Sequence, residues 1–262
     1  MQPLNEPSRA GPSQLTYVGH ATVLVEMDGV RLITDPLLRN RIVHLRRHKR
    51  SDQPADNLNV DAVLVSHLHF DHLDLPSLRR LGHTTRLIVP RGAAKLLANF
   101  ENVEELSAGD VTTVGSVKIK ATQAYHARRR HPFGPAADTL GFLIEGRHTV
   151  YFPGDTDLFP EMAELADKID VALLPVWGWG LNLGKGHMDP YRAAEALKLL
   201  QPGLAIPIHW GTLHPWGIGW LMVRILANPP HMFAQYARYL APEVKTCVVS
   251  PGETISVDET LA

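Results

Sequence analysis

The sequence predicts an α/β protein in which two mixed β-sheets are covered on their outer faces by helices. Strand-like runs dominate the first half of the chain, and strands alternate with helices in the second half. Hydrophobic residues make up 45% and charged residues 20% of the sequence, which is typical of a globular protein with a core. Because no low-complexity linker divides the 262 residues, we expect a single domain over residues 14–262 after a flexible tail of residues 1–13.

The first elements are expected to form a meander of strands. A strand-like run over residues 15–26 is followed by Asp28-Gly29 and a second run over 30–34, and an Asp-Gly pair between β-branched runs favours a hairpin. Residues 37–58 are polar and basic, so we expect a long loop there. The short apolar run over residues 62–66 is typical of a strand that is buried on both faces.

The rest of the chain alternates more regularly. The middle part predicts a helix over residues 92–100, a loop over 125–138, and strands over 86–89, 103–106, 111–114, 117–124, 140–145 and 149–152. The second half predicts helices over 160–168, 190–200 and 231–240, and strands over 171–175, 204–207, 246–249 and 254–257. Asp189 before Pro190 has the pattern of an N-cap followed by a first-turn proline.

Composition limits the function classes. The formal net charge of −1 supplies no global field that would recruit nucleic acid or an anionic membrane. The single cysteine, Cys247, excludes an internal disulfide and is typical of a reducing compartment. Since the sequence has neither a signal-peptide pattern nor a run of about 20 apolar residues, we predict a cytoplasmic protein without a membrane span. The unusual feature is the number of histidines, 14, because histidine is the commonest metal ligand.

The strongest functional signal is His-Leu-His-Phe-Asp-His at positions 67–72, directly after a predicted strand. Side chains two positions apart in an extended chain point the same way, so His67 and His69 can reach one ion together. Asp71 and His72 can then face a second ion, and imidazole and carboxylate groups suit a cation such as zinc. The alternative is a polar loop with surface histidines, but four ligand-type residues in six positions favour a metal site.

Three further ligand-type residues follow the ends of predicted strands. His126 follows the strand over 117–124, Asp155 follows the one over 149–152, and His209 follows the one over 204–207. In layered α/β folds, ligands gather at one end of the strands. Taken singly, each histidine is compatible with a hydrogen-bonded loop residue and the aspartate with a turn residue. Together with positions 67–72, they predict one site that holds two cations.

Several segments match a known family. They are residues 19–22, 34–36, 67–72, 154–156, 186–190 and 209–212. Through them the chain resembles the metallo-β-lactamase superfamily, and in particular the branch similar to the ascorbate-6-phosphate lactonase and the N-acyl-phosphatidylethanolamine phospholipase D. The similarity extends from about residue 15 to residue 257. Positions 67–72 are specific for the superfamily, and the segments around His187 and His209 indicate the branch.

The resemblance implies a four-layer αββα sandwich with two divalent metal ions at one edge of the packed sheets. Carried over position by position, the expected ligands are His67, His69 and His126 for the first ion, Asp71, His72 and His209 for the second, and Asp155 as a bridge. Every ligand position holds a suitable residue, which argues against an inactive homologue. Zinc is the expected metal, and manganese and iron accept nearly the same ligands.

Such a centre predicts a hydrolase that needs no protein nucleophile. Two adjacent cations can hold a hydroxide between them and polarise the bond that it attacks. Asp71 is the candidate for orienting this bridging hydroxide, a role that the resemblance also implies. The predicted reaction is cleavage of an ester-type bond, either in a phosphoester or phosphodiester or in a lactone.

Five residues outside the ligand set are candidates for supporting roles. Asp35 either orients a metal-bound histidine or only forms a turn. His187 either donates a proton to the leaving group or packs locally before a helix, and the resemblance favours the catalytic role. The resemblance also places His20 at the site. Trp177 and Trp179 either form an apolar wall of the substrate pocket or fill the core.

Basic runs at residues 39–50 and 128–131 are either solvated surface or a means of attracting an anionic small-molecule substrate. A nuclease would use the same metals, with these runs along a nucleic-acid backbone. The charge near zero and the lack of length for an appended domain argue against it, so we expect no stable nucleic-acid complex. A di-iron redox protein is disfavoured because His69 stands where such relatives carry a carboxylate. A non-catalytic binding module and a homo-oligomer stay open.

Overall fold

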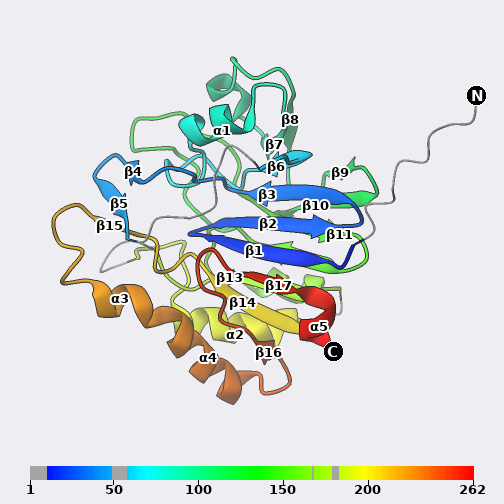
Figure 1. Ribbon diagram of the computed structural model, residues 1–262, viewed down its shortest axis with the longest axis vertical. Coiled ribbons are helices and arrows are strands. Elements are labelled where there is room, and N and C mark those ends of the chain that lie inside the picture. The colour runs from blue at the N-terminus through cyan, green and yellow to red at the C-terminus, as the bar shows by residue number, and fades with distance from the viewer. Residues whose placement is uncertain (1–10, 49–57, 167, 179–182) are drawn as a thin grey trace, which may run out of the picture.

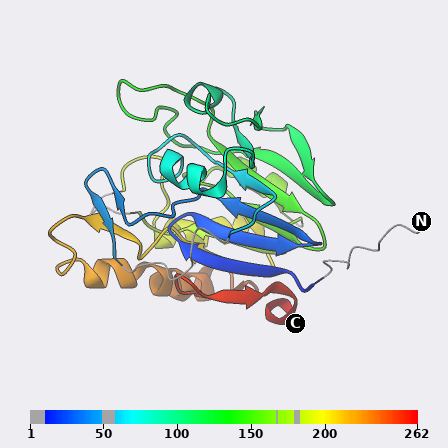
Figure 2. The same ribbon diagram turned by 45° about the horizontal axis from the view of Figure 1, so that its top comes forward.

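The computed structural model describes residues 11–48, 58–166, 168–178 and 183–262. Two mixed sheets of seven strands each pack against one another, and helices lie on both outer faces (Figures 1 and 2). The predicted fold class, a four-layer αββα sandwich, is therefore confirmed. Most of the predicted tail, residues 1–13, lies outside the described residues. The tail and the single domain over residues 14–262 stay predictions.

The first sheet combines an antiparallel and a parallel half. Its strands, in spatial order, are β17 (Thr254–Ser256), β1 (Gln14–Gly19), β2 (Thr22–Met27), β3 (Val30–Thr34), β6 (Ala62–Leu64), β7 (Arg86–Pro90) and β8 (Val103–Leu106). The strands from β17 to β3 are antiparallel, and those from β3 to β8 are parallel. The parallel strands therefore end at the same edge of the sheet.

The second sheet has the same division. Its order is β16 (Lys245–Thr246), β14 (Leu204–Ile208), β13 (Val171–Pro175), β12 (Thr149–Phe152), β11 (Leu140–Glu145), β10 (Val117–Gln123) and β9 (Val111–Val114). The strands from β12 to β16 are parallel, whereas β9, β10, β11 and β12 form an antiparallel meander. Crossover connections through helices join the parallel strands, as parallel pairing requires.

Side chains of the central strands alternate between two hydrophobic cores. Leu32 of β3 and Leu64 of β6 belong to the core between the sheets. Ile33 and Val63, one position away, belong to the outer core beneath α1 (Leu75–Leu81). Successive strand side chains point to opposite faces, so a strand buried on both faces must be apolar throughout. This explains the continuous apolar run before the histidine motif.

Helices α2 (Pro190–Leu200) and α4 (Pro229–Leu240) pack against each other on the outer side of the second sheet (Figure 1). Shorter helices are α3 (Val223–Ala227) and α5 (Val257–Leu261). Over the described part of the chain, no helix combines the length and the apolar character that crossing a bilayer would require.

The start of α2 is fixed by Asp189, whose side chain accepts a hydrogen bond from the backbone N–H of Arg192 at 2.9 Å. We expect Asp189→Ala to lower the free energy of unfolding by about 1 kcal/mol, because the substitution leaves that N–H without its cap. Asp189→Asn keeps the acceptor and is the matched control. Urea titrations would show the difference. Equal midpoints for the two variants would mean that the cap contributes nothing.

Four predicted helices or strands are wrong in detail. The strand predicted over residues 246–249 is a two-residue strand, Lys245–Thr246. The run over residues 15–26 is two strands, because Gly19 and His20, with φ of 121° and 60°, turn the chain between β1 and β2. The helix predicted over 92–100 is only a single 3₁₀ turn, Ala94–Leu96. The helix predicted over 160–168 is a 3₁₀ helix, Pro160–Leu165, which Pro160 begins.

The loop predicted over residues 37–58 contains two short strands, β4 (Arg41–Ile42) and β5 (Leu45–Arg47). With β15 (Leu213–Pro215) they form a third, three-stranded sheet. Its buried side covers a small hydrophobic cluster that includes Ile42 and Leu45. This small sheet lies beside the edge of the sandwich where the ligand-type residues gather.

Candidate metal centre

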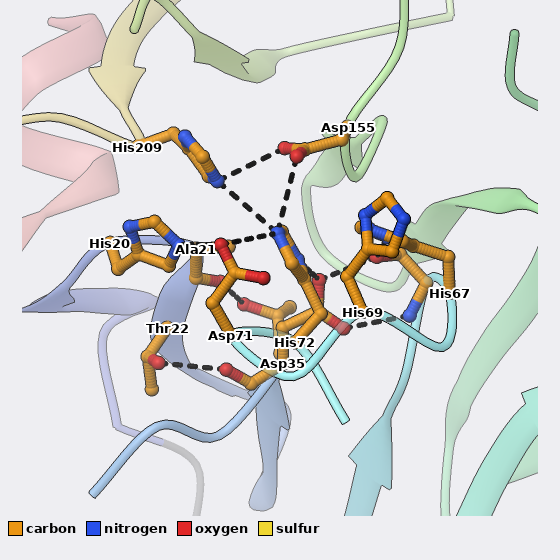
Figure 3. Close-up of polar contacts among 12 residues, drawn as sticks. His20, Ala21, Thr22, Asp35, His67, His69, Asp71, His72, Asp155 and His209 are labelled. Carbon is orange, nitrogen blue, oxygen red and sulfur yellow. Dashed lines mark hydrogen bonds and ion pairs between the residues drawn. The ribbon is translucent and has the colours of Figure 1, made fainter. Parts of the chain in front are cut away.

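The predicted ligands lie at one edge of the sandwich, where strands of both sheets end, and Figure 3 labels all of them except His126. The 67–72 loop follows β6, Asp155 follows β12, and His209 directly follows β14. His126 lies three residues beyond the end of β10. The backbone N–H of His209 donates to the carbonyl of His20 at 2.8 Å, which joins the two sheets at this edge. Segments far apart in the sequence therefore meet around one small volume.

A first cluster consists of three histidines. Nε2 of His67 and Nε2 of His126 each lie 3.0 Å from Nδ1 of His69. The three ligand atoms lie within 4.8 Å of one another. Nitrogen atoms about 2.0–2.1 Å from a tetrahedral ion are separated by roughly 3.3 Å, so this spacing fits one shared cation.

A second cluster contains Asp71, His72, His209 and His20, whose ligand atoms again lie within 4.8 Å of one another. Nε2 of His72 is 3.2 Å from Nε2 of His209, and Nε2 of His20 is 3.0 Å from Oδ2 of Asp71. The His20 ring also lies on that of His209, with ring centroids 3.8 Å apart. Sequence reasoning placed His20 at the site only as a lining residue. The geometry makes it a candidate fourth ligand.

Asp155 lies between the two clusters and is only 3% exposed. Its carboxylate oxygens are 3.2 Å from Nε2 of His72 and 3.2 Å from Nε2 of His209. A ligand atom of the same residue groups with those of His126 and His187. This position is compatible with a bridging carboxylate, and the bridging role stays a prediction.

Three of the six histidines of the two clusters are oriented by acceptors outside the clusters. From Nδ1, His72 bonds to Asp35 Oδ2 at 2.7 Å, His126 to the Gly186 carbonyl at 2.7 Å, and His209 to the Trp177 carbonyl at 2.7 Å. An acceptor at Nδ1 keeps the proton there, so Nε2 presents its lone pair to the cluster. Metal-binding histidines in proteins have this arrangement. The donor set therefore fits divalent cations.

The charges of the site fit cations as well. Burial lowers the pKa of His126 to about 4 and that of His209 to about 3. Burial opposes ionisation of Asp71 and Asp155, but neighbouring histidines hold the pKa of both carboxyls below the usual range. His72 is the exception: although burial lowers its pKa, the neighbouring carboxylates of Asp155, Asp71 and Asp35 raise it well above the usual value. Near neutral pH the site therefore offers ionised carboxylates and, at His126 and His209, neutral imidazoles, whereas a cation that binds at His72 has to displace its proton.

Three residues of the site have left-handed backbone conformations. The φ angles are 60° for His20, 33° for Asp35 and 64° for His209. Such a conformation costs an L-residue with a Cβ atom roughly 1 kcal/mol or more. Strain of this kind persists only where the surrounding fold holds it, and here it coincides with the ligand-type residues.

The Asp35 side chain forms hydrogen bonds with residues at both ends of the 67–72 loop. Its carboxylate accepts from the backbone N–H of Ser66 at 2.7 Å, from the Ser66 hydroxyl at 2.5 Å and from Nδ1 of His72 at 2.7 Å. Its side chain is fully buried, and its own carbonyl accepts a hydrogen bond from the Thr22 hydroxyl. The position agrees with the predicted role of orienting a histidine, which stays a prediction.

We expect Asp35→Asn to weaken metal binding about 10- to 100-fold, because an amide cannot accept all three of these hydrogen bonds. Competition against a chromophoric chelator would measure the change. Asp61→Asn is the matched control, since Asp61 also accepts from a backbone N–H, that of Arg31 at 2.8 Å, but lies away from the site. Equal metal affinity in Asp35→Asn and the wild type would contradict the role assigned to this carboxylate.

A cavity of about 500 Å³ opens above both clusters. Its walls are mainly apolar and include Ile42, Phe70 and Leu183. His187 also lines the cavity, and its Nε2 lies 3.5 Å from Asp155 Oδ2. The side chain of Trp177 packs against the core between the sheets, and only its carbonyl contacts the site. Trp179 lies outside the described residues.

Sequence reasoning missed the contribution of Arg130. Its guanidinium donates to the carbonyls of Leu68 at 2.6 Å and Leu73 at 3.1 Å, and lies 4.1 Å from the centre of the Phe70 ring. Arg130 therefore holds both ends of the 67–72 loop and also lines the cavity. The basic run at 128–131 was visible in the sequence, but nothing local indicates which arginine faces the loop.

Comparison with known proteins agrees with this geometry. Residues 30–210 match the family described as the β-lactamase superfamily domain. A UPF0173 metal-dependent hydrolase from Opitutus terrae is 33% identical over 256 residues, which cover 93% of this chain and 100% of the relative. A second one, from Methanopyrus kandleri, is 29% identical over 92% of this chain and 98% of its own.

The solved structure of Igni18, a metallo hydrolase from Ignicoccus hospitalis, is 26% identical to this chain. It covers 94% of this chain and 98% of its own with a TM-score of 0.72. The family match extends over more than half of the chain, and similarity to the hydrolases extends over nearly all of it. The chain thus belongs to the metallo-β-lactamase superfamily and, within it, to the UPF0173 metal-dependent hydrolases.

Proposed function

We propose that the chain hydrolyses an ester-type bond of an anionic small molecule, a phosphoester or phosphodiester or a lactone, at a centre that holds two divalent cations, with zinc as the expected metal. The observation that carries this proposal is the pair of clusters on either side of the buried Asp155 carboxylate. The donor set supports zinc, and manganese or iron would accept the same groups. The narrower resemblance to the lactonase and phospholipase branch stays a prediction, as do a cytoplasmic location and a homo-oligomer.

When bound, two such cations would activate water and polarise the bond under attack. The residues of the chain would then orient the reacting groups. Asp71, which lies 3.0 Å from Nε2 of His20, offers an ionised carboxylate that can accept a hydrogen bond from the attacking water and orient it. Although burial lowers it, the pKa of His187 is raised overall by its contact with Asp155. This shift favours the protonated form of His187, which lines the cavity and is the candidate to donate a proton to the leaving group.

An activity screen tests the proposal. Protein loaded separately with zinc and with manganese would be assayed on carboxylic esters, lactones, phosphomonoesters and phosphodiesters. We expect hydrolysis of at least one anionic member, and its loss in His67→Ala. His83→Ala is the matched control, because His83 is exposed on the surface, where its Nδ1 bonds to the Asn99 carbonyl at 2.8 Å, and it belongs to neither cluster. Hydrolysis that persists in His67→Ala would contradict the metal mechanism.

The same screen addresses the nuclease alternative. Single-stranded RNA and DNA would be included as substrates, at low and high salt. Cleavage of these polymers with preference over the small phosphodiesters would replace the proposed substrate class. The proposed metal centre would be unaffected by this outcome, because both reactions use the same ligands.

A further inference from the structure

A second groove, of about 1080 Å³, lies beside the cavity of the metal centre. The strands β4 and β5 separate the two, since Ile42 and Leu45 line the metal cavity whereas Arg41 and Arg46 line the groove. Successive side chains of a strand point to opposite faces, so this short hairpin is a wall with two different sides. None of the predicted metal ligands lines the groove.

Basic side chains cross the small sheet in register on the groove side. Arg41 of β4 lies directly opposite Arg46 of β5, and Arg46 lies directly opposite His214 of β15. Like charges directly opposite each other destabilise an antiparallel pair. Among the described residues, none that lines the groove is acidic, and neither arginine forms an ion pair. The repulsion in this row is therefore left uncompensated within the described chain.

Two further arginines line the groove: Arg39, which pairs with the buried Asp74 at 2.6 Å, and Arg47, which is only 6% exposed. The contacts of Arg47 differ from those of Arg39. The Arg47 guanidinium donates to backbone carbonyls, that of Val18 at 3.4 Å and that of Leu37. The described part of the chain supplies no carboxylate to it. Two arginines elsewhere on the surface are paired, Arg31 with Glu26 at 2.8 Å and Arg86 with Glu104 at 2.7 Å. The Arg47 guanidinium is thus held inside the protein, and the groove offers the guanidinium groups of Arg41 and Arg46 to an anion.

Two tryptophans form the aromatic part of the groove. Trp216 and Trp220 both line it, and they are 71% and 76% exposed. The loop that carries them approaches the sheet closely at Gly219, where a Cβ atom would lie 2.5 Å from Cε1 of His214. Because Gly219 has no side chain, this loop can lie directly against the row formed by Arg41, Arg46 and His214. Exposed indole faces next to guanidinium groups are suited to stacking a planar ring.

We propose that this groove binds a phosphate-bearing small molecule with a planar ring, of which a nucleoside monophosphate is the simplest example. The phosphate oxygens accept from the guanidinium groups of Arg41 and Arg46, which match phosphate in a two-pronged geometry. The ring stacks on Trp216 or Trp220. The proposal does not rest on the hydrolytic reaction, because no residue of the groove belongs to the metal centre.

Isothermal titration calorimetry on the full, metal-loaded chain tests the proposal with three probes: inorganic phosphate, ribose 5-phosphate and AMP. We expect AMP to bind at least about five-fold more tightly than ribose 5-phosphate, because only AMP has a ring to stack. Arg46→Gln is expected to weaken AMP binding about ten-fold or more. The double variant Trp216→Ala, Trp220→Ala is expected to abolish the preference for AMP over ribose 5-phosphate. Arg79→Gln, an exposed arginine of α1, is the matched control.

Several outcomes would overturn the proposal. AMP could bind no more tightly than inorganic phosphate, or its binding could survive both groove variants while their melting temperatures match the wild type. Loss of AMP binding in His67→Ala but not in Arg46→Gln would place the nucleotide at the metal centre. Sedimentation with phosphatidylglycerol vesicles that depends on Arg46, without AMP binding, would make the groove a lipid-facing surface. The proposed hydrolysis could hold in each of these cases.

Discussion

Asp155→Asn is expected to lower kcat/KM for the hydrolysed substrate by about 10³-fold or more. The asparagine keeps the size of the side chain but removes the charge that lies between the two clusters, 3.2 Å from both His72 and His209. Two cations close together need an anionic ligand between them, and their stabilisation of transition-state charge is worth several kcal/mol. Rates measured in metal-saturated buffer, with metal content determined by mass spectrometry, would show the effect.

The control for this prediction is Asp157→Asn, two residues further along the same loop. Asp157 pairs with Arg192 at 2.5 Å and is not part of either cluster. Its substitution therefore tests whether a lost carboxylate in this loop lowers activity without changing the metal centre. We expect Asp157→Asn to retain activity within a few-fold of the wild type. If Asp155→Asn stays within ten-fold of the wild type while its metal content is unchanged, Asp155 is not a bridging ligand.

Removing the metal is expected to lower the melting temperature by about 10 °C. Metal bound at a free concentration about 1,000-fold above its Kd stabilises the folded state by about 4 kcal/mol. For a chain of this size, each kcal/mol shifts the melting temperature by about 2–4 °C. The structural reason is that the buried carboxylates of Asp35, Asp71 and Asp155 lie close together and lose their strongest counter-charge. Thermal scans with and without chelator, followed by addition of zinc, would measure the shift.

A variant that lacks a ligand separates this effect from non-specific chelator effects. His209→Ala removes one ligand-type nitrogen from the second cluster, so the chelator should shift its melting temperature by less than it shifts that of the wild type. His231→Ala, an exposed histidine of α4, should keep the full shift. A wild-type melting temperature that does not respond to chelator would argue against a metal centre in the folded protein.

Hydrophobic periodicity and short motifs were sufficient to predict that the chain forms two sheets and to identify much of the candidate metal site. The residues at positions 67–72 are close in sequence, and the apolar run before them predicts a buried strand, so their common location follows from local geometry. His126 and His209 needed a second argument, namely that strands of a layered fold end at one edge. The structure brings both histidines to this edge.

His20 was harder to interpret because its position depends on long-range packing. It interrupts a run that has the pattern of a single strand, and only its left-handed backbone, with φ of 60°, turns its ring toward Asp71 and His209. The strands β4 and β5 escaped prediction for a similar reason. Each has two or three residues, and their sheet is completed by β15, more than 160 residues later in the chain. Short strands of this kind depend on distant partners and leave no local periodicity.

At His20, Asp35 and His209, the left-handed backbone conformation and the function of the side chain favour different residue types. The backbone alone would favour glycine at each of them, and only the use of the side chain opposes that preference. At Asp35 the three buried hydrogen bonds of the carboxylate oppose such a change whatever the chemistry. A descendant of this protein that no longer catalyses a reaction is therefore expected to accumulate glycine or asparagine at positions 20 and 209 before position 35.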